Sequence, residues 1–159
     1  MRLPCSPAAQ SIDTDIMESG QLSMGIVKPS KTHTEGGAYR YLENANGLLK
    51  ATAIEDNIYL DKKPVRKAFG TAYLAILEAI NEALIKKGLT RKELPKSVDG
   101  YMAAIKKHLS VNNGKLVREF DRLYETLHIA GYYRGLITRV ATVKVEIKGT
   151  EDFIRKLLP

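Results

Sequence analysis

The sequence has few of the residues on which covalent cross-links and common metal sites depend. Cys5 is the only cysteine among the 159 residues, so neither an internal disulfide nor a cysteine-based zinc site can form. The three histidines, His33, His108 and His128, do not have the i, i+4 spacing that binds a metal on a helix. We therefore expect no metal and no other cofactor.

The sequence also lacks the motifs of familiar enzyme classes and of exported proteins. It contains no nucleophile elbow, phosphate loop or dinucleotide fingerprint. Residues 1–4 lack the apolar segment of a secretion signal. No apolar run approaches the roughly 18 residues needed to span a bilayer. These absences predict a soluble, cytoplasmic protein without a membrane partner, and they favour a non-enzymatic protein over an enzyme.

What the chain does carry is an excess of positive charge, with a formal net charge of +7. Residues 1–40 are balanced, whereas residues 41–159 hold 21 basic and 14 acidic side chains. Such an excess indicates either a solvated lysine-rich surface or contact with nucleic acid, a phosphorylated ligand or an acidic partner. The solvated surface is favoured, because the basic residues occur as scattered pairs such as Lys86-Lys87.

The first 35 residues differ in composition from the rest. Residues 1–35 are rich in Ser, Thr, Pro and Gly and show no sustained apolar period. Such a segment buries too little apolar surface to offset the entropy lost on ordering. We predict a disordered tail over 1–35 and a helical bundle domain over 36–159.

The strongest helical pattern covers the residues between Asp61 and Gly88. Asp61 suits the N-cap, Pro64 the first turn and Gly88 the C-terminal stop. Gly70 lies among alanines, and this small-residue surface predicts close approach of another helix, within the bundle or across a dimer. The core-helix prediction rests on apolar positions at steps of four and three: Val65, Phe69, Ala72, Ile76, Ala79 and Ala83.

Weaker patterns predict the remaining helices. The first is expected over residues 39–54, before a polar connector at 55–57, and the third is short and capped by Ser97. A fourth helix follows and is expected to break or end at Gly131, and a last short helix is expected to be capped by Thr150.

Residues 136–149 are ambiguous. Val143, Val145 and Ile147 alternate with polar residues as in a strand, but we find no second strand for them to pair with. We therefore expect a helix start or an extended crossover there. Together the patterns predict an all-α, four- or five-helix up-and-down bundle, forming a homodimer through a helical face.

Two segments, residues 65–79 and 123–132, resemble the HEPN class of helical bundles. The first is similar to the alanine-rich, tyrosine-containing central helix of that class, and the second to the stretch around its signature. Residues 127–135 also resemble a small uncharacterised bacterial family of unknown function that is itself HEPN-like. The resemblance covers about residues 39–158 and implies an HEPN-like bundle.

The HEPN resemblance implies an alternative function, a metal-independent, toxin-like ribonuclease. Such enzymes use an arginine and a following histidine on one helix near a dimer interface, and this chain offers Arg122 and His128. A second alignment instead places Leu127 at the arginine position and Tyr132 at the histidine position. Six residues also leave the two side chains about 120° apart around an α-helix. A further HEPN role is that of a helical partner of a nucleotidyltransferase.

The favoured function is therefore a non-enzymatic HEPN-like binding or interaction module of unknown ligand. Tyr132, Tyr133 and Arg134 are the candidate ligand-binding residues, because two aromatic rings and a guanidinium can stack a base and hold a phosphate. The same residues could instead close the end of a bundle. The candidate partners are RNA, a nucleotide or a protein. A pair of acids, Glu78 and Glu82, has either a buried role or, more commonly, forms a solvated face.

Overall fold

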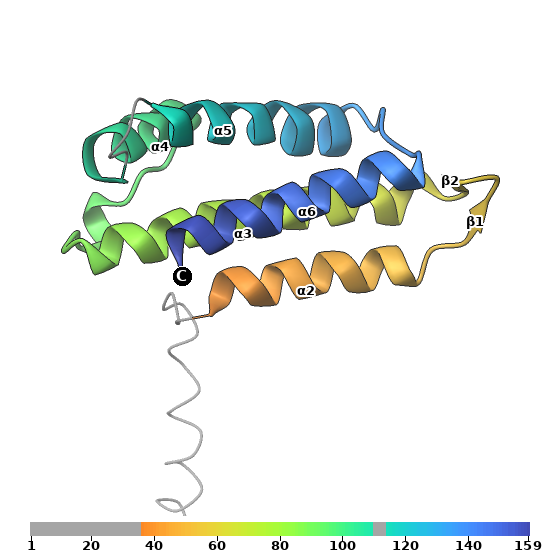
Figure 1. The fold of residues 1–159 in the computed structure, drawn as a ribbon, viewed down its shortest axis with the longest axis horizontal. Helices are drawn as coiled ribbons and strands as arrows, with labels where there is room; N and C mark the ends of the chain where they lie inside the picture. Colours follow the sequence, from red (N-terminus) through yellow and green to blue (C-terminus); the bar gives the residue numbers. More distant parts are fainter. Residues whose placement is uncertain (1–35, 110–113) are drawn as a thin grey trace, which may run out of the picture. The chain divides into compact units, whose positions relative to one another are not determined.

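The computed structural model describes residues 36–109 and 114–159, which belong to one compact unit (Figure 1). The predicted tail, residues 1–35, lies outside the described residues. Within the described part, the long helices run in alternating directions, which confirms the predicted all-α, up-and-down bundle. The elements in chain order are α2 (Gly37–Lys50), β1 (Ile54–Glu55), β2 (Ile58–Tyr59), α3 (Lys62–Lys86), the 3-10 turn η2 (Arg91–Glu93), α4 (Val98–Ala104), the π-helix η3 (Ile105–Leu109), α5 (Lys115–Leu123), the π-helix η4 (Tyr124–Tyr133) and α6 (Val140–Leu157).

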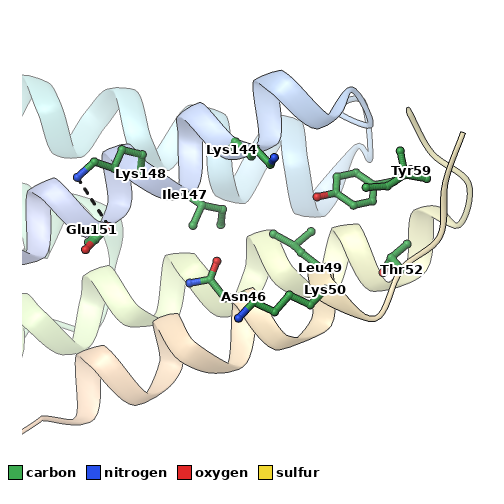
Figure 2. A pocket seen from close by; sticks show the side chains of 10 residues that line it. Asn46, Leu49, Lys50, Thr52, Tyr59, Lys144, Ile147, Lys148 and Glu151 are labelled. Atoms are coloured by element: carbon green, nitrogen blue, oxygen red, sulfur yellow. Dashed lines mark ion pairs between the residues drawn. The ribbon is translucent and has the colours of Figure 1, made fainter. Parts of the chain in front are cut away.

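A small antiparallel hairpin, β1–β2, replaces the predicted polar connector, and α2 ends at Lys50 instead of near residue 54. Its turn residues Asp56 and Asn57 have φ values of 47° and 67°, in the left-handed region that Asp and Asn tolerate in tight hairpin turns. Tyr59 of β2 is buried, and its ring points towards Leu49 and Ile147 (Figure 2).

The hairpin is fastened to the connection that leads into α6. Ile58 forms a bridge with Arg139, the Tyr59 N–H donates to the Thr138 carbonyl at 3.0 Å, and the Val140 N–H donates to the Asn57 carbonyl at 2.9 Å. Thr138 and Arg139, just before α6, are extended because they pair with β2. The sequence analysis did not identify β2 as a strand.

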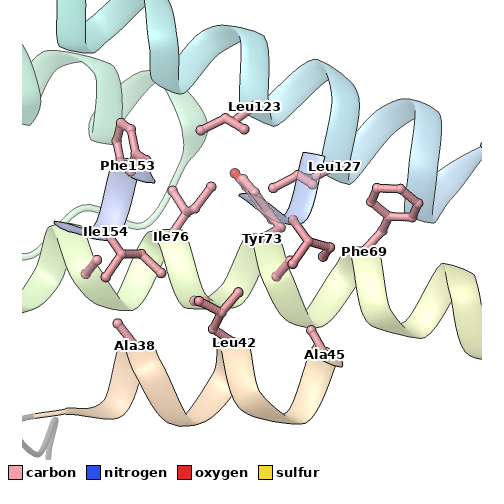
Figure 3. Close-up of a cluster of buried hydrophobic side chains, with 14 of the residues drawn as sticks. Ala38, Leu42, Ala45, Phe69, Tyr73, Ile76, Leu123, Leu127, Phe153 and Ile154 are labelled. Atoms are coloured by element: carbon pink, nitrogen blue, oxygen red, sulfur yellow. The ribbon is translucent and has the colours of Figure 1, made fainter. Parts of the chain in front are cut away.

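The core helix α3 begins and ends as the sequence predicted. The Asp61 carboxylate accepts from the Lys63 N–H at 2.9 Å, and Gly88 takes a φ of +102° beyond the last turn. Phe69 and Ile76 of α3 are fully buried and face α5 and η4, whereas Leu42 of α2 faces α3 from the other side (Figure 3). The helix thus packs between two layers.

Among the described residues, α3 alone is long and apolar enough to cross a bilayer, judged by length and composition. The prediction from uninterrupted apolar runs did not identify it. Its most apolar window has a mean hydropathy of 1.3, and 67% of that window is buried inside the protein. That burial is typical of the core helix of a soluble bundle.

The small-residue surface of α3 is used inside the bundle, which decides between the two predicted uses. Both α2 and α6 pack against α3, and Ala38 and Ala45 on α2 are themselves fully buried. Methyl side chains let helix backbones approach closely without leaving voids. The fully buried alanines of α3 are Ala68, Ala72, Ala75 and Ala79.

Two predicted helix boundaries are wrong. Thr150 does not cap a last short helix; it lies within α6, is fully buried, and its hydroxyl donates to the Glu146 carbonyl one turn earlier at 2.9 Å. Gly131 does not end a helix either, since η4 continues to Tyr133. The helix start predicted as one alternative for residues 136–149 is confirmed, because α6 begins at Val140; within it Val143 and Ile147 are buried while Val145 is 66% exposed.

Candidate functional site

The π-helix η4 presents three stacked rings along one side. Tyr124, His128 and Tyr132 are spaced four residues apart, so they are neighbours on the helix surface. The ring centroids of Tyr124 and His128 are 5.5 Å apart at an interplanar angle of 23°, and those of His128 and Tyr132 are 5.9 Å apart at 21°. Such offset aromatic pairs stabilise one another beyond the area that they bury. Insertions of π-helix are frequent at functional sites.

Tyr73 of α3 adds a fourth ring to this stack. Its centroid lies 4.9 Å from that of His128 and 5.8 Å from that of Tyr124. Burial, together with the neighbouring Tyr124 and Tyr101 hydroxyls, raises the pKa of the Tyr73 phenol well above 10.0. Tyr73 is therefore a neutral hydroxyl at every physiological pH.

Two glycines bring η4 and α3 close enough to form the stack. A Cβ atom on Gly70 of α3 would lie 2.9 Å from Cδ2 of Tyr132, and one on Gly131 of η4 would lie 2.5 Å from Cγ of Phe69. Each helix thus accepts a ring of the other where it has no side chain. The close approach that the sequence predicted at Gly70 is confirmed.

Arg66 of α3 fixes the C-terminal end of η4. Its Nε donates to the Tyr132 carbonyl at 2.8 Å, and an Nη atom donates to the Tyr133 carbonyl at 2.9 Å. A cation at this position satisfies carbonyls that have no partner within the helix and interacts favourably with the helix dipole. Arg66 therefore positions Tyr132, and the sequence analysis did not identify it.

Beside the stacked rings lies a cavity of about 420 Å³, which we call the aromatic groove. Its volume falls in the range of small-molecule sites, roughly 300–1,000 Å³. Leu74 on its wall is 46% exposed, so the groove reaches the surface. Its lining residues come from α2, α3 and η4: Leu48, Lys67, Gly70, Thr71, Tyr73, Leu74, His128 and Tyr132.

The structure separates the three predicted ligand-binding residues. Tyr132 lines the aromatic groove, whereas Tyr133 and Arg134 do not. The Tyr133 side chain is 70% exposed and Arg134 is exposed. Three consecutive residues on a helix point in different directions, so only one of them can face a given groove.

The predicted catalytic pair has separate partners. Arg122 donates to Glu146 of α6 at 2.9 Å, and its side chain is 51% exposed. His128 instead lies among the rings of Tyr73, Tyr124 and Tyr132. The structure thus directs Arg122 towards α6 and His128 into the aromatic groove, and does not bring the two together.

Of the predicted acid pair, Glu82 is a buried structural group. It is 6% exposed, and its carboxylate accepts from the backbone N–H groups of Gly36 at 3.2 Å and Ala38 at 3.1 Å. These donors lie at the N-terminus of α2, where a negative charge is favourable. Glu78, one turn earlier, lies beside Gly37. The solvated-face interpretation is therefore wrong for Glu82.

Within residues 36–109 and 114–159, no group of three His, Cys, Asp or Glu residues could hold a metal ion. The side chains that line the aromatic groove offer ring stacking, hydrogen bonding from Thr71 and His128, and the positive charge of Lys67.

The fold and the groove define an all-α bundle with a ligand-sized aromatic groove. The chain belongs to the family of the domain of unknown function DUF5618, whose model matches residues 33–158. It is similar in structure to a protein of unknown function from Dyadobacter fermentans, with a TM-score of 0.61 and 29% sequence identity over 76% of this chain and 88% of that chain. No curated protein matches the chain. The predicted membership of a family of unknown function agrees with these findings.

Proposed function

We propose that this chain is a non-enzymatic, HEPN-like binding module that holds a nucleobase or nucleotide in the aromatic groove. The observation that carries the proposal is the stack of His128 and Tyr132, which lines a cavity of about 420 Å³ that also holds Lys67. Every nucleobase has a π face, and stacking on aromatic side chains holds a base without reading its sequence.

The polar residues of the groove suit a negatively charged ligand. Lys67 is exposed and forms no ion pair with any other described residue, so its ammonium group is free to meet a phosphate. Thr71 adds a hydroxyl on the same helix, one turn further on. An aromatic wall with one nearby cation favours a planar ring that carries an anionic group over a neutral aliphatic ligand.

A homodimer and a cytoplasmic location remain parts of this proposal. The alanine face of α3, one of the candidate dimer surfaces, is buried within the chain, so a dimer would use a different helical face. Sedimentation equilibrium of the purified protein tests this directly, with a mass of twice 17.7 kDa expected for a dimer.

Calorimetric titration with adenosine monophosphate tests the groove. Tyr132→Ala removes a stacking ring and is expected to weaken binding about tenfold or more, since one base–aromatic stack contributes about 1–3 kcal/mol. Tyr133→Ala is the matched control, because it removes the neighbouring exposed tyrosine that does not line the groove. Equal losses in both variants, or no binding to the wild type, would rule out the groove as the site.

The ribonuclease alternative has its own test. Purified protein incubated with RNA in EDTA is expected to leave the RNA intact, because Arg122 is held by Glu146 and does not join His128. Cleavage by the wild type that disappears in a folded His128→Ala variant would replace the binding module with a metal-independent nuclease.

A further inference from the structure

A second cavity, of about 400 Å³, lies at the opposite end of α2 from the Glu82 carboxylate. It is bounded by the last turn of α2, the hairpin and α6 (Figure 2). It shares no lining residue with the aromatic groove. We call it the lysine cavity, and its lining residues are Asn46, Leu49, Lys50, Thr52, Ile54, Tyr59, Lys144, Ile147, Lys148 and Glu151.

The charge around this cavity is unbalanced. Three lysines from two helices line it, against the single carboxylate of Glu151. Lys50 and Lys144 form no ion pair with another described residue, although both border the same cavity. Both side chains are exposed, so both ammonium groups are free to turn to an anion bound in the cavity.

The third lysine is engaged only weakly. Lys148 lies 2.8 Å from Asp152 and 3.8 Å from Glu151, and its side chain is 58% exposed. Exposed ion pairs of this kind contribute little to stability, so Lys148 can turn to a ligand at small cost.

The floor of the cavity is apolar, with hydrogen-bond donors at its edge. Leu49 and Ile147 are buried and form the middle of the wall, and the Tyr59 hydroxyl points towards them (Figure 2). Burial raises the pKa of the Tyr59 phenol, so this hydroxyl stays protonated and remains a donor. Asn46 supplies an amide on the α2 side.

We infer that the lysine cavity is a second binding site, which takes a small phosphate monoester with a short aliphatic body. Lys50 and Lys144 hold the phosphate dianion, and Tyr59 and Asn46 donate hydrogen bonds to its oxygens. The aliphatic body lies against Leu49 and Ile147. Lysine ammonium groups bind phosphate as point charges, and no planar stacking surface is required here.

Calorimetric titration of the full chain with butyl phosphate at low salt tests the inference. The wild type is expected to bind, and Lys50→Gln/Lys144→Gln to weaken binding about tenfold or more, the equivalent of losing one strong charged contact. Lys92→Gln/Lys96→Gln is the matched control: it removes the same two charges from exposed positions outside both cavities and should leave the affinity within about twofold. Thermal unfolding confirms that each variant is folded.

Three results would overturn the inference. They are no binding of butyl phosphate, equal losses in Lys50→Gln/Lys144→Gln and in Lys92→Gln/Lys96→Gln, and equal affinity for inorganic phosphate, which would remove any role for Leu49 and Ile147. Tyr59→Phe should also weaken binding, since it keeps the ring and loses the donor. Tyr132→Ala, which alters only the aromatic groove, should not change butyl phosphate binding, so failure here is distinguishable from failure of the nucleotide proposal.

Discussion

Small residues lie on two faces of α3, and the two faces pack against different neighbours. On the alanine face, Ala68, Ala72, Ala75 and Ala79 are fully buried under neighbouring helices and leave no open space. On the glycine side, Gly70 lacks even a methyl group, and the ring of Tyr132 occupies its place. The aromatic groove lies beside that ring, which is one of its lining side chains. Small residues thus serve close helix packing on the alanine face and the packing of a ring beside an open groove at Gly70.

The largest effect is expected from Gly131→Ala, which would put a methyl group where the ring of Phe69 lies. The new Cβ would be 2.5 Å from Phe69 Cγ, and Phe69 is fully buried and cannot move away. We expect a loss of about 1–3 kcal/mol in the free energy of unfolding, measured by urea denaturation.

Gly47→Ala provides the control for that substitution. Gly47 lies inside α2 with no atom within 4 Å of an added Cβ. Alanine there should raise stability by about 0.5–1 kcal/mol through helix propensity alone. If both substitutions shift stability in the same direction, the η4–α3 contact is not as close as described.

Glu82→Gln tests the buried contact between α3 and the N-terminus of α2. The substitution keeps the shape but removes the charge that faces the Gly36 and Ala38 N–H groups, and a loss of about 1–2 kcal/mol is expected. Glu43→Gln, an exposed acid on α2, should change stability by less than about 0.5 kcal/mol. Equal effects in urea denaturation would show that Glu82 does not cap α2.

Alkaline pH should weaken the stack of rings. The pKa of Tyr73 is raised in the folded protein, so above pH 10.0 the unfolded chain releases this proton first. Stability is fully present below that pH and falls above it, by at most about 1.4 kcal/mol per pH unit from this group. Tyr73→Phe should flatten the fall in free energy of unfolding between pH 9 and 11. An unchanged slope would contradict the burial of this hydroxyl.

The smallest effect on stability is expected from Gly70→Ala, which discriminates packing from binding. The added Cβ meets Cδ2 of Tyr132, and Tyr132 is 44% exposed and free to rotate outwards. The higher helix propensity of alanine should offset the cost of moving the Tyr132 ring, so the free energy of unfolding should change by less than about 0.5 kcal/mol. Binding of adenosine monophosphate should nevertheless weaken, because the ring has left the groove. Unchanged binding would show that Tyr132 does not hold the ligand.

The core helix was predictable because its signals are local. Asp61, Pro64 and Gly88 act within one turn of the helix ends, and the apolar period continues between them. The hairpin was missed because strands of two residues are too short to show alternation. Its available signal was the pair Asp56-Asn57, which takes positive φ in tight turns.

The site was only partly visible in the sequence. The spacing of Tyr124, His128 and Tyr132 places three rings on one side of a helix. The sequence analysis did not use this spacing and predicted the consecutive residues 132–134 as the ligand-binding residues instead. The change from α5 to the π-helix η4 occurs at Tyr124 and has no local signature in the sequence. The lysine cavity could not be predicted, because Lys50 and Lys144 come to border one cavity only through the packing of α2 and α6.

The bridge between Ile58 and Arg139 gives the fold a mechanical property. The hydrogen bonds between residues 57–59 and 138–140 join the two ends of the segment that runs from β2 to the end of η4, so this segment forms a closed loop. A force that pulls on the two ends of the described chain can extend the backbone of α2 and α6 while these bonds hold, but it can extend the backbone of α3 only after they break. We therefore expect mechanical stretching to unfold α2 and α6 in one step, and to unfold α3 with its stacked rings in a second step.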